Sequence, residues 1–269
     1  MHKNTFIFIK KYEIYLFLIF APIINGLFVY GVKSDIIPGR IYLHGRFFLL
    51  LFLLMFMVWF TKGREGLRNI FKPMLKWNVP FKWYLLSLFF ASIIACLTLL
   101  IKALYLGGDY SVFLISTSHV SDPKFMFNLI LWAFVGEVVW VSYAVRELSK
   151  SMNVFFASQI VGIVWAFWWA PIVWLNVGVI QDLPLWPLII SMMAVAGMCA
   201  VMYGQTKSGI CVWVLQTMLN TTLVIFYITP SSGGIPTYVL FSILYFLAML
   251  AFMYFLNINN KFKSLKIKE

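Results

Sequence analysis

The residues best suited to chemistry in this chain are few, and they lie in apolar surroundings. Glu137 stands inside the run FVGEVVW (134–140), and Gln216 and Asn220 lie four residues apart in a second apolar run. A carboxyl group can give or take a proton, and amides four residues apart share one helix face, from which they hydrogen-bond to a neighbouring helix. Glu137 is therefore the first candidate for a functional residue. A carboxyl group with a purely structural role is the alternative.

Metal and thiol chemistry have little material in this sequence. The histidines and cysteines are His2, His44, His119, Cys96, Cys199 and Cys211. No histidine is close in sequence to Glu137 or Gln216, and the cysteines lie in apolar runs without a CxxC pair. Zinc sites need clustered His and Cys ligands. We predict no metal site, no disulfide framework and no cofactor.

Composition determines which elements must position these residues. Of the 269 residues, 62% are hydrophobic and 11% are charged, and the mean hydropathy is +0.91. Soluble domains have roughly 45–50% apolar and about 25% charged residues. A soluble enzyme, a disordered chain and a collagen-like fibre are excluded. The composition predicts an all-α polytopic membrane helix bundle, in which the net charge of +12 reflects topology and not a nucleic-acid partner.

Apolar runs long enough to cross a bilayer occur eight times, since about 20 residues are needed for each helix. The predicted spans are 13–32, 43–61, 83–105, 125–145, 154–175, 184–204, 209–229 and 236–256. We treat 1–269 as a single integral membrane domain. It has an N-terminal part (1–124), a core (125–229) and a last span with a basic tail (230–269).

The basic residues test this topology. Most of the 21 lysines and arginines fall before the first span, in 62–82, after the fourth and sixth spans, and after the last. The positive-inside rule then predicts a plasma-membrane protein with both termini in the cytoplasm. The basic loop 62–82 is either an amphipathic helix on membrane lipid or a simple topology signal. His44 and Arg46, at the edge of the second span, are expected to snorkel to the interface.

Three of the spans carry motifs that resemble those of the CPBP family of CAAX prenyl proteases and bacteriocin-processing or self-immunity proteins. The run GEVVWVSY (136–143) resembles the family's EExxWRGY, and SQIVGIVWAFWWAP (158–171) resembles its SxxxGxxF/WGxWHxP helix. The run TKS (206–208), followed by Gln216 and Asn220, resembles TGS…HxxxN. The resemblance covers about residues 125–225. It implies a CPBP-like intramembrane protease core in spans four to seven.

The chain departs from the family at most catalytic positions. In the family, the second glutamate and the histidine of the second motif activate water, and the last histidine and the asparagine stabilise the oxyanion. Only Glu137 and Asn220 remain at these positions. The replaced positions are Gly136, Val141, Trp169 and Gln216. Indole cannot accept a proton or bind a metal, so the resemblance implies a protease framework without protease chemistry.

Three functions remain open. The first is a non-catalytic binding, adaptor, self-immunity or peptide-maturation protein that holds a transmembrane or peptide partner, or membrane lipid, in the former substrate cavity. Trp140, Trp165 and Trp168 are candidates for its walls, although tryptophans at this spacing also fit an ordinary packing stripe. The second is an active intramembrane endopeptidase that uses Glu137. The third is a transporter or lipid-handling protein.

Overall fold

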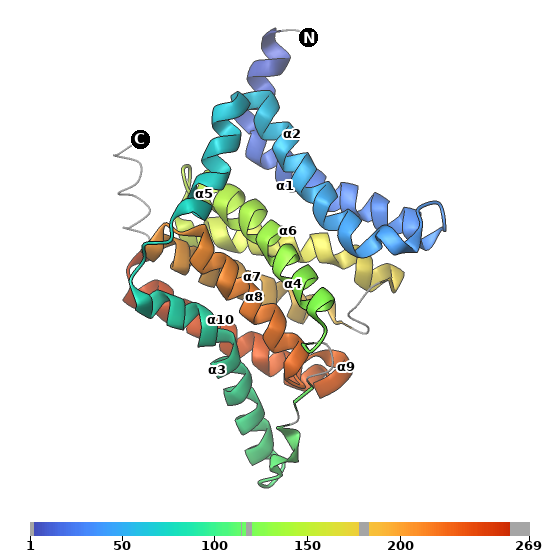
Figure 1. Ribbon diagram of the computed structural model, residues 1–269, viewed down its shortest axis with the longest axis vertical. Helices are drawn as coiled ribbons and strands as arrows, with labels where there is room; N and C mark the ends of the chain where they lie inside the picture. The colour runs from blue at the N-terminus through green and yellow to red at the C-terminus, as the bar shows by residue number, and fades with distance from the viewer. Residues whose placement is uncertain (1–2, 114, 117–119, 178–182, 259–269) are drawn as a thin grey trace.

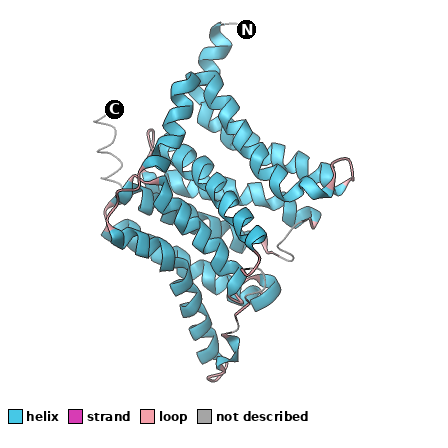
Figure 2. Cartoon of the chain, in the orientation of Figure 1, coloured by secondary structure: helices cyan, strands magenta, loops and turns pink. Residues whose placement is uncertain are grey.

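The computed structural model describes residues 3–113, 115–116, 120–177 and 183–258. Within them the chain is helical, as Figure 2 shows, and β-structure is limited to one isolated bridge between Ile115 and Phe226. The α-helices are α1 (Lys3–Lys33), α2 (Tyr42–Phe71), α3 (Phe81–Tyr105), α4 (Pro123–Gly136), α5 (Arg146–Leu148), α6 (Val154–Leu175), α7 (Leu185–Thr206), α8 (Gly209–Ile225), α9 (Pro230–Gly233) and α10 (Ile235–Phe255). The other helical turns are η1 (Gly39–Ile41), η2 (Lys72–Leu75), η3 (Tyr110–Val112) and the π-helix η4 (Glu137–Val145).

The fold is an all-α polytopic membrane helix bundle. Within the described residues, seven helical segments are long and apolar enough to cross a bilayer, and each matches a predicted span. The remaining prediction, 209–229, corresponds to α8, which is shorter. It ends at Ile225 because Phe226 is extended and pairs with Ile115 of the loop before α4. This tertiary contact is not visible in a hydropathy pattern.

The bundle is built around α7. This helix packs against α6, α8 and α10 and is the most deeply buried of the seven spans. Its inner positions include Ala194, Gly197 and Ala200, and small residues allow helices to approach closely in membranes. In Figure 1, α1 and α2 lie together along one side of the bundle and α3 and α10 along the other, with α4, α7 and α8 between them.

Two interruptions in the helices shape the rest of the structure. Gly63 has a φ of +62°, so the long helix α2 kinks two residues after the predicted end of its span. Beyond the kink, residues 64–71 are helical and the basic loop packs its buried residue Ile70 onto the core. The second interruption is η4, in which the helix that begins at Pro123 widens from α to π geometry at Glu137.

Candidate functional site

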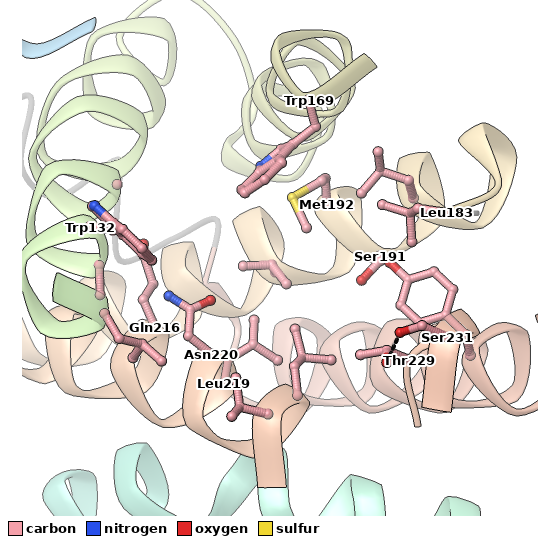
Figure 3. Close-up of a pocket in the computed structure, with 18 of the residues that line it drawn as sticks. Trp132, Trp169, Leu183, Ser191, Met192, Gln216, Leu219, Asn220, Thr229 and Ser231 are labelled. Atoms are coloured by element: carbon pink, nitrogen blue, oxygen red, sulfur yellow. Dashed lines mark hydrogen bonds between the residues drawn. The ribbon is translucent and has the colours of Figure 1, made fainter. Parts of the chain in front are cut away.

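A cavity of about 400 Å³ lies between α2, α4, α6, α7 and α8. Its walls are mainly aliphatic and aromatic. In Figure 3, Trp132, Trp169 and Asn220 reach into it from α4, α6 and α8. Pockets for small ligands typically measure about 300–1,000 Å³ and have apolar walls with a few polar groups. The cavity therefore has the size and character of a ligand site.

Five of the motif positions and wall candidates named from the sequence line this cavity: Gly136, Trp165, Trp169, Gln216 and Asn220. They come from three separate stretches of the chain, which the fold brings together. The amide of Asn220 has no hydrogen-bond partner among the described residues.

Gly136 and Gln216 fit each other closely. A Cβ atom at position 136 would lie 2.5 Å from Gln216 Oε1 and 3.6 Å from Trp165 Cζ2. The amide of Gln216 thus occupies the space that any side chain at position 136 would need. Gln216 Nε2 donates a weak hydrogen bond to Cys199 Sγ at 3.7 Å. The two replaced motif positions are therefore complementary, because the glycine makes room for the glutamine.

Glu137 lies behind the cavity wall and not in it. Its side chain is 0% exposed, and its Oε1 accepts a hydrogen bond from the Ser142 hydroxyl at 2.6 Å. A π-helix pairs residues five apart, so η4 brings residue 142 next to residue 137. Gly209 of α8 covers the carboxylate, since a Cβ atom there would lie 3.0 Å from Glu137 Oε1. Glu137 Oε2 has no partner within the described structure.

Four tryptophans form an aromatic layer that begins at the cavity wall and continues behind it. Trp140 stacks on Trp165 with ring centroids 5.6 Å apart and meets Trp168 edge-on at 6.3 Å. Trp168 in turn packs edge-on against Trp169 at 5.5 Å. Of these rings, Trp165 and Trp169 face the cavity, whereas Trp140 and Trp168 are almost fully buried. Val141 is also completely buried, within the hydrophobic core.

Arg46 corrects one expectation drawn from the sequence. It does not snorkel to the interface but is 3% exposed and lines the cavity. Its guanidinium carbon lies 4.0 Å from the centroid of the Trp168 ring and 4.2 Å from that of Trp169. Proximity to the end of a span suggested an exposed arginine, but the aromatic residues of α6 enclose it. The unusual number of tryptophans in α6 was the only available signal.

A second polar cluster escaped the sequence analysis. We call it the ion-pair network; it consists of Glu13, Thr61, Lys62, Tyr143 and Glu147. Lys62 Nζ lies 2.9 Å from Glu13 Oε1 and 3.0 Å from Glu147 Oε2. The Tyr143 hydroxyl donates to Glu13 Oε1 at 2.8 Å, and the Thr61 hydroxyl donates to Glu13 Oε2. Glu13, Lys62 and Glu147 each lie at or next to the end of a predicted span, and the predicted topology places these three ends on the same side of the membrane. This shared side was the one signal in the sequence that could have indicated the network.

The described lining of the cavity offers mainly apolar surface and hydrogen-bond donors. Among the described residues that line it, Arg46 is the only one with a permanently charged side chain, and none is a carboxylate, a histidine or a cysteine. The described residues also contain no group of three metal-ligating side chains that could hold an ion. The amides and the arginine can donate hydrogen bonds. The lining as described contains no carboxylate or imidazole that would serve as a general base.

Comparison of the chain with protein-family models and with curated proteins finds no match in either case.

Proposed function

We propose that this chain is a non-catalytic, CPBP-like membrane protein that binds a ligand in the cavity and acts as an adaptor, self-immunity or peptide-maturation factor. The observation that carries this proposal is the separation of Glu137 from the cavity. The motif positions Gly136, Trp169, Gln216 and Asn220 line the cavity, whereas the remaining acidic group is enclosed behind them. A cavity of this volume, without a carboxylate or imidazole in its described lining, is suited to holding a molecule.

A photo-crosslinking experiment tests whether the cavity is occupied. Benzoylphenylalanine placed at Leu223, which lines the cavity, is compared with the same residue placed at Phe89, which is 54% exposed on α3. Irradiation of native membranes is expected to give a discrete adduct at position 223 that is absent at position 89. The same adducts at both positions, or none at position 223, would contradict binding in the cavity.

Trp169 offers a second test of the same proposal. Trp169→Ala removes an indole from the cavity wall and is expected to reduce the adduct at position 223 severalfold. The matched aromatic control is Phe167→Ala, which removes a 43% exposed ring from the same helix. Equal adduct yields in the two variants would show that the wall contributes nothing to binding. Trp169→His alone is not expected to create peptidase activity.

An active intramembrane endopeptidase is the second candidate. It is supported by the unpartnered oxygen Glu137 Oε2 and by the π-helix at this residue, because π-helical turns occur frequently at functional sites. It requires that Met74 and Gly209, which pack close together beside the carboxylate, move to admit substrate and water. This candidate predicts a cleavage product that disappears in Glu137→Gln.

We further propose that both termini face the cytoplasm of a cell whose plasma membrane holds the protein. The support is the basic character of 62–82 and of the other predicted inner segments. Single cysteines at Ser111 and Ser151 distinguish the two orientations. A membrane-impermeant maleimide added to intact cells is expected to label position 111 and not position 151, and the opposite result would reverse the topology.

A further inference from the structure

Arg46 is a buried cation without an anionic partner among the residues that the structure describes. It lies one turn into α2 and is 3% exposed. No described carboxylate lies within ion-pair distance of it, in contrast to Lys62 and Lys150. Its only hydrogen bond within the described structure runs from Nη1 to the Tyr42 hydroxyl at 3.3 Å, and Nε and Nη2 have no acceptor there. Buried charges in proteins are ordinarily paired and hydrogen-bonded.

The aromatic rings around Arg46 hold the guanidinium in place but do not complete its bonding. Trp168 and Trp169 lie 4.0 Å and 4.2 Å from its central carbon, and Phe47 lies at 5.2 Å. Ring faces stabilise a cation through their quadrupole, but these contacts leave Nε and Nη2 without an acceptor. The rings therefore enclose a charge whose Nε and Nη2 lack an acceptor in the described structure, and a head group in the cavity would reach them through a shift of these rings.

The same region has further donors without acceptors. The indole N–H groups of Trp132, Trp168 and Trp169 are buried and have no partner within the described residues. The Phe47 ring, beside Arg46, stacks on Trp132 at 5.5 Å, which places all these groups in one cluster. Trp132 and Trp169 also line the cavity (Figure 3). The chemistry missing from this cluster is an acceptor with negative charge.

The side-chain oxygen of Asn25 is an acceptor near Arg46, but it does not supply a negative charge. Asn25 Oδ1 is unpartnered and lies with Arg46 around a gap between α1, α2 and α6 that has no room for water. An amide oxygen is neutral, so it does not balance the charge of a guanidinium.

The rest of the cavity indicates what the anion is attached to. Leu188, Met192, Leu219 and Leu223 form an apolar part of the same lining. An extended peptide would need partners for each backbone N–H and C=O group in this environment. The lining surface is mainly apolar, although the amides of Gln216 and Asn220 and several hydroxyl groups also lie in it. The Thr229 hydroxyl is already shared with Ser231 and Ser232 at 3.2 Å and 2.8 Å. The lining therefore favours an alkyl chain over a peptide.

We propose that the cavity binds a single-chain anionic amphiphile, whose carboxylate or phosphate head group is held by Arg46 while its alkyl chain lies against the apolar walls. This inference rests on the proposed function, because it names the class of ligand that the cavity holds. A guanidinium presents paired N–H groups that match both carboxylate and phosphate oxygens. A fatty acid and a lysophospholipid are the two sources of this chemistry.

Binding is measured on the purified full chain in phosphatidylcholine nanodiscs, by displacement of the fluorescent probe cis-parinaric acid. The competitors are hexadecanoate, hexadecyl lysophosphatidate and the neutral hexadecanol. Charge-assisted hydrogen bonds predict that an anionic competitor binds roughly 10- to 100-fold more tightly than the alcohol. Hexadecanoate binding more tightly than the lysophosphatidate identifies a fatty acid as the ligand, and the reverse order identifies a phosphate head group. Both orders support the proposal.

Arg46→Gln is expected to abolish this preference while it changes alcohol binding by less than about threefold, since only the charged interaction with the head group is removed. The matched control is Arg40→Gln, which removes an exposed arginine from the same end of the bundle and should leave the preference intact. If Arg46→Gln does not fold, the comparison of head groups in the unaltered protein still decides the matter. Equal binding of acid and alcohol overturns the anion site but leaves a ligand cavity in place. If no amphiphile binds but a crosslinked adduct still forms at position 223, the ligand is not an amphiphile. The proposed function, binding of a ligand in the cavity, then still stands.

Discussion

The ion-pair network and the cavity differ in whether a buried cation has a carboxylate beside it among the described residues. In the network, Lys62 bridges Glu13 and Glu147, and Glu13 also receives hydrogen bonds from Thr61 and Tyr143. At the cavity, Arg46 is more deeply buried than Lys62 yet has no carboxylate beside it within the described residues. A charge that the chain itself compensates fixes the packing of α1, α2 and α5. A charge without a described counter-charge beside a cavity is the observation on which our proposal of a bound anion rests.

We expect the largest change in the free energy of unfolding from a substitution in the ion-pair network. Lys62→Met leaves Glu13 buried without its cation. Because the Lys62 side chain is 33% exposed, we expect a loss of about 2–3 kcal/mol in the free energy of unfolding, below the full cost of breaking a buried pair. Unfolding of the detergent-solubilised protein by sodium dodecyl sulfate measures it.

The control for this prediction is Lys150→Met. Lys150 also pairs with Glu147, at 3.0 Å, but its side chain is 50% exposed, and exposed pairs contribute about 0–1 kcal/mol. If the two lysine variants lose the same free energy of unfolding, burial of the network does not strengthen its ion pairs. The difference in stabilising role between Lys62 and Arg46 would then not hold.

Glu137 lies between the two extremes, because one carboxylate oxygen is bonded and the other is not. Ser142→Ala removes the hydrogen bond to Oε1, and we expect a loss of about 1–2 kcal/mol in the free energy of unfolding. Ser149→Ala is the matched control, since Ser149 is also buried but bonds only to the Val145 carbonyl of its own helical segment. Equal losses in the two variants would mean that the π-helical contact does not stabilise the carboxylate.

We expect the smallest change in the free energy of unfolding from a substitution of Arg46, the buried cation of the cavity. Arg46→Gln in ligand-free protein removes a charge that has no carboxylate partner among the described residues, so relief of its desolvation offsets the loss of the cation–π attraction and of the hydrogen bond to Tyr42. We expect the free energy of unfolding to change by less than about 1 kcal/mol. The same denaturant titration is repeated with hexadecanoate, which should stabilise the unaltered protein and not the variant. A loss as large as that of Lys62→Met would show that Arg46 is a structural residue.

The sequence predicted the membrane fold and its spans because long apolar runs determine where helices form in a bilayer. It also identified Glu137, Gln216 and Asn220 as polar groups that need an explanation. It did not predict the burial of Arg46 and Glu13. A charged residue near the end of a span has the same sequence pattern whether it reaches the interface or turns inward, and only the packing of α1 and α6 against α2 decides between the two.

The contact between Gly136 and Gln216 was beyond sequence reasoning for a related reason. These residues are 80 positions apart, and the complementarity depends on how α4 and α8 pack. The π-helix is similar, because the sequence of η4 has no proline or glycine that marks it. The early end of α8 depends on the pairing of Phe226 with Ile115. Local patterns predicted elements, whereas these site details depend on contacts between elements.

We propose that the cavity binds a ligand and that Glu137 has no catalytic role. The most direct test compares the membrane peptidomes of cells that carry the native protein, Glu137→Gln and the control Glu65→Gln, with all three proteins at equal abundance. We predict identical sets of peptide termini in the three samples. A cleavage event that is lost in Glu137→Gln and kept in Glu65→Gln would contradict the account and identify the substrate of an active peptidase.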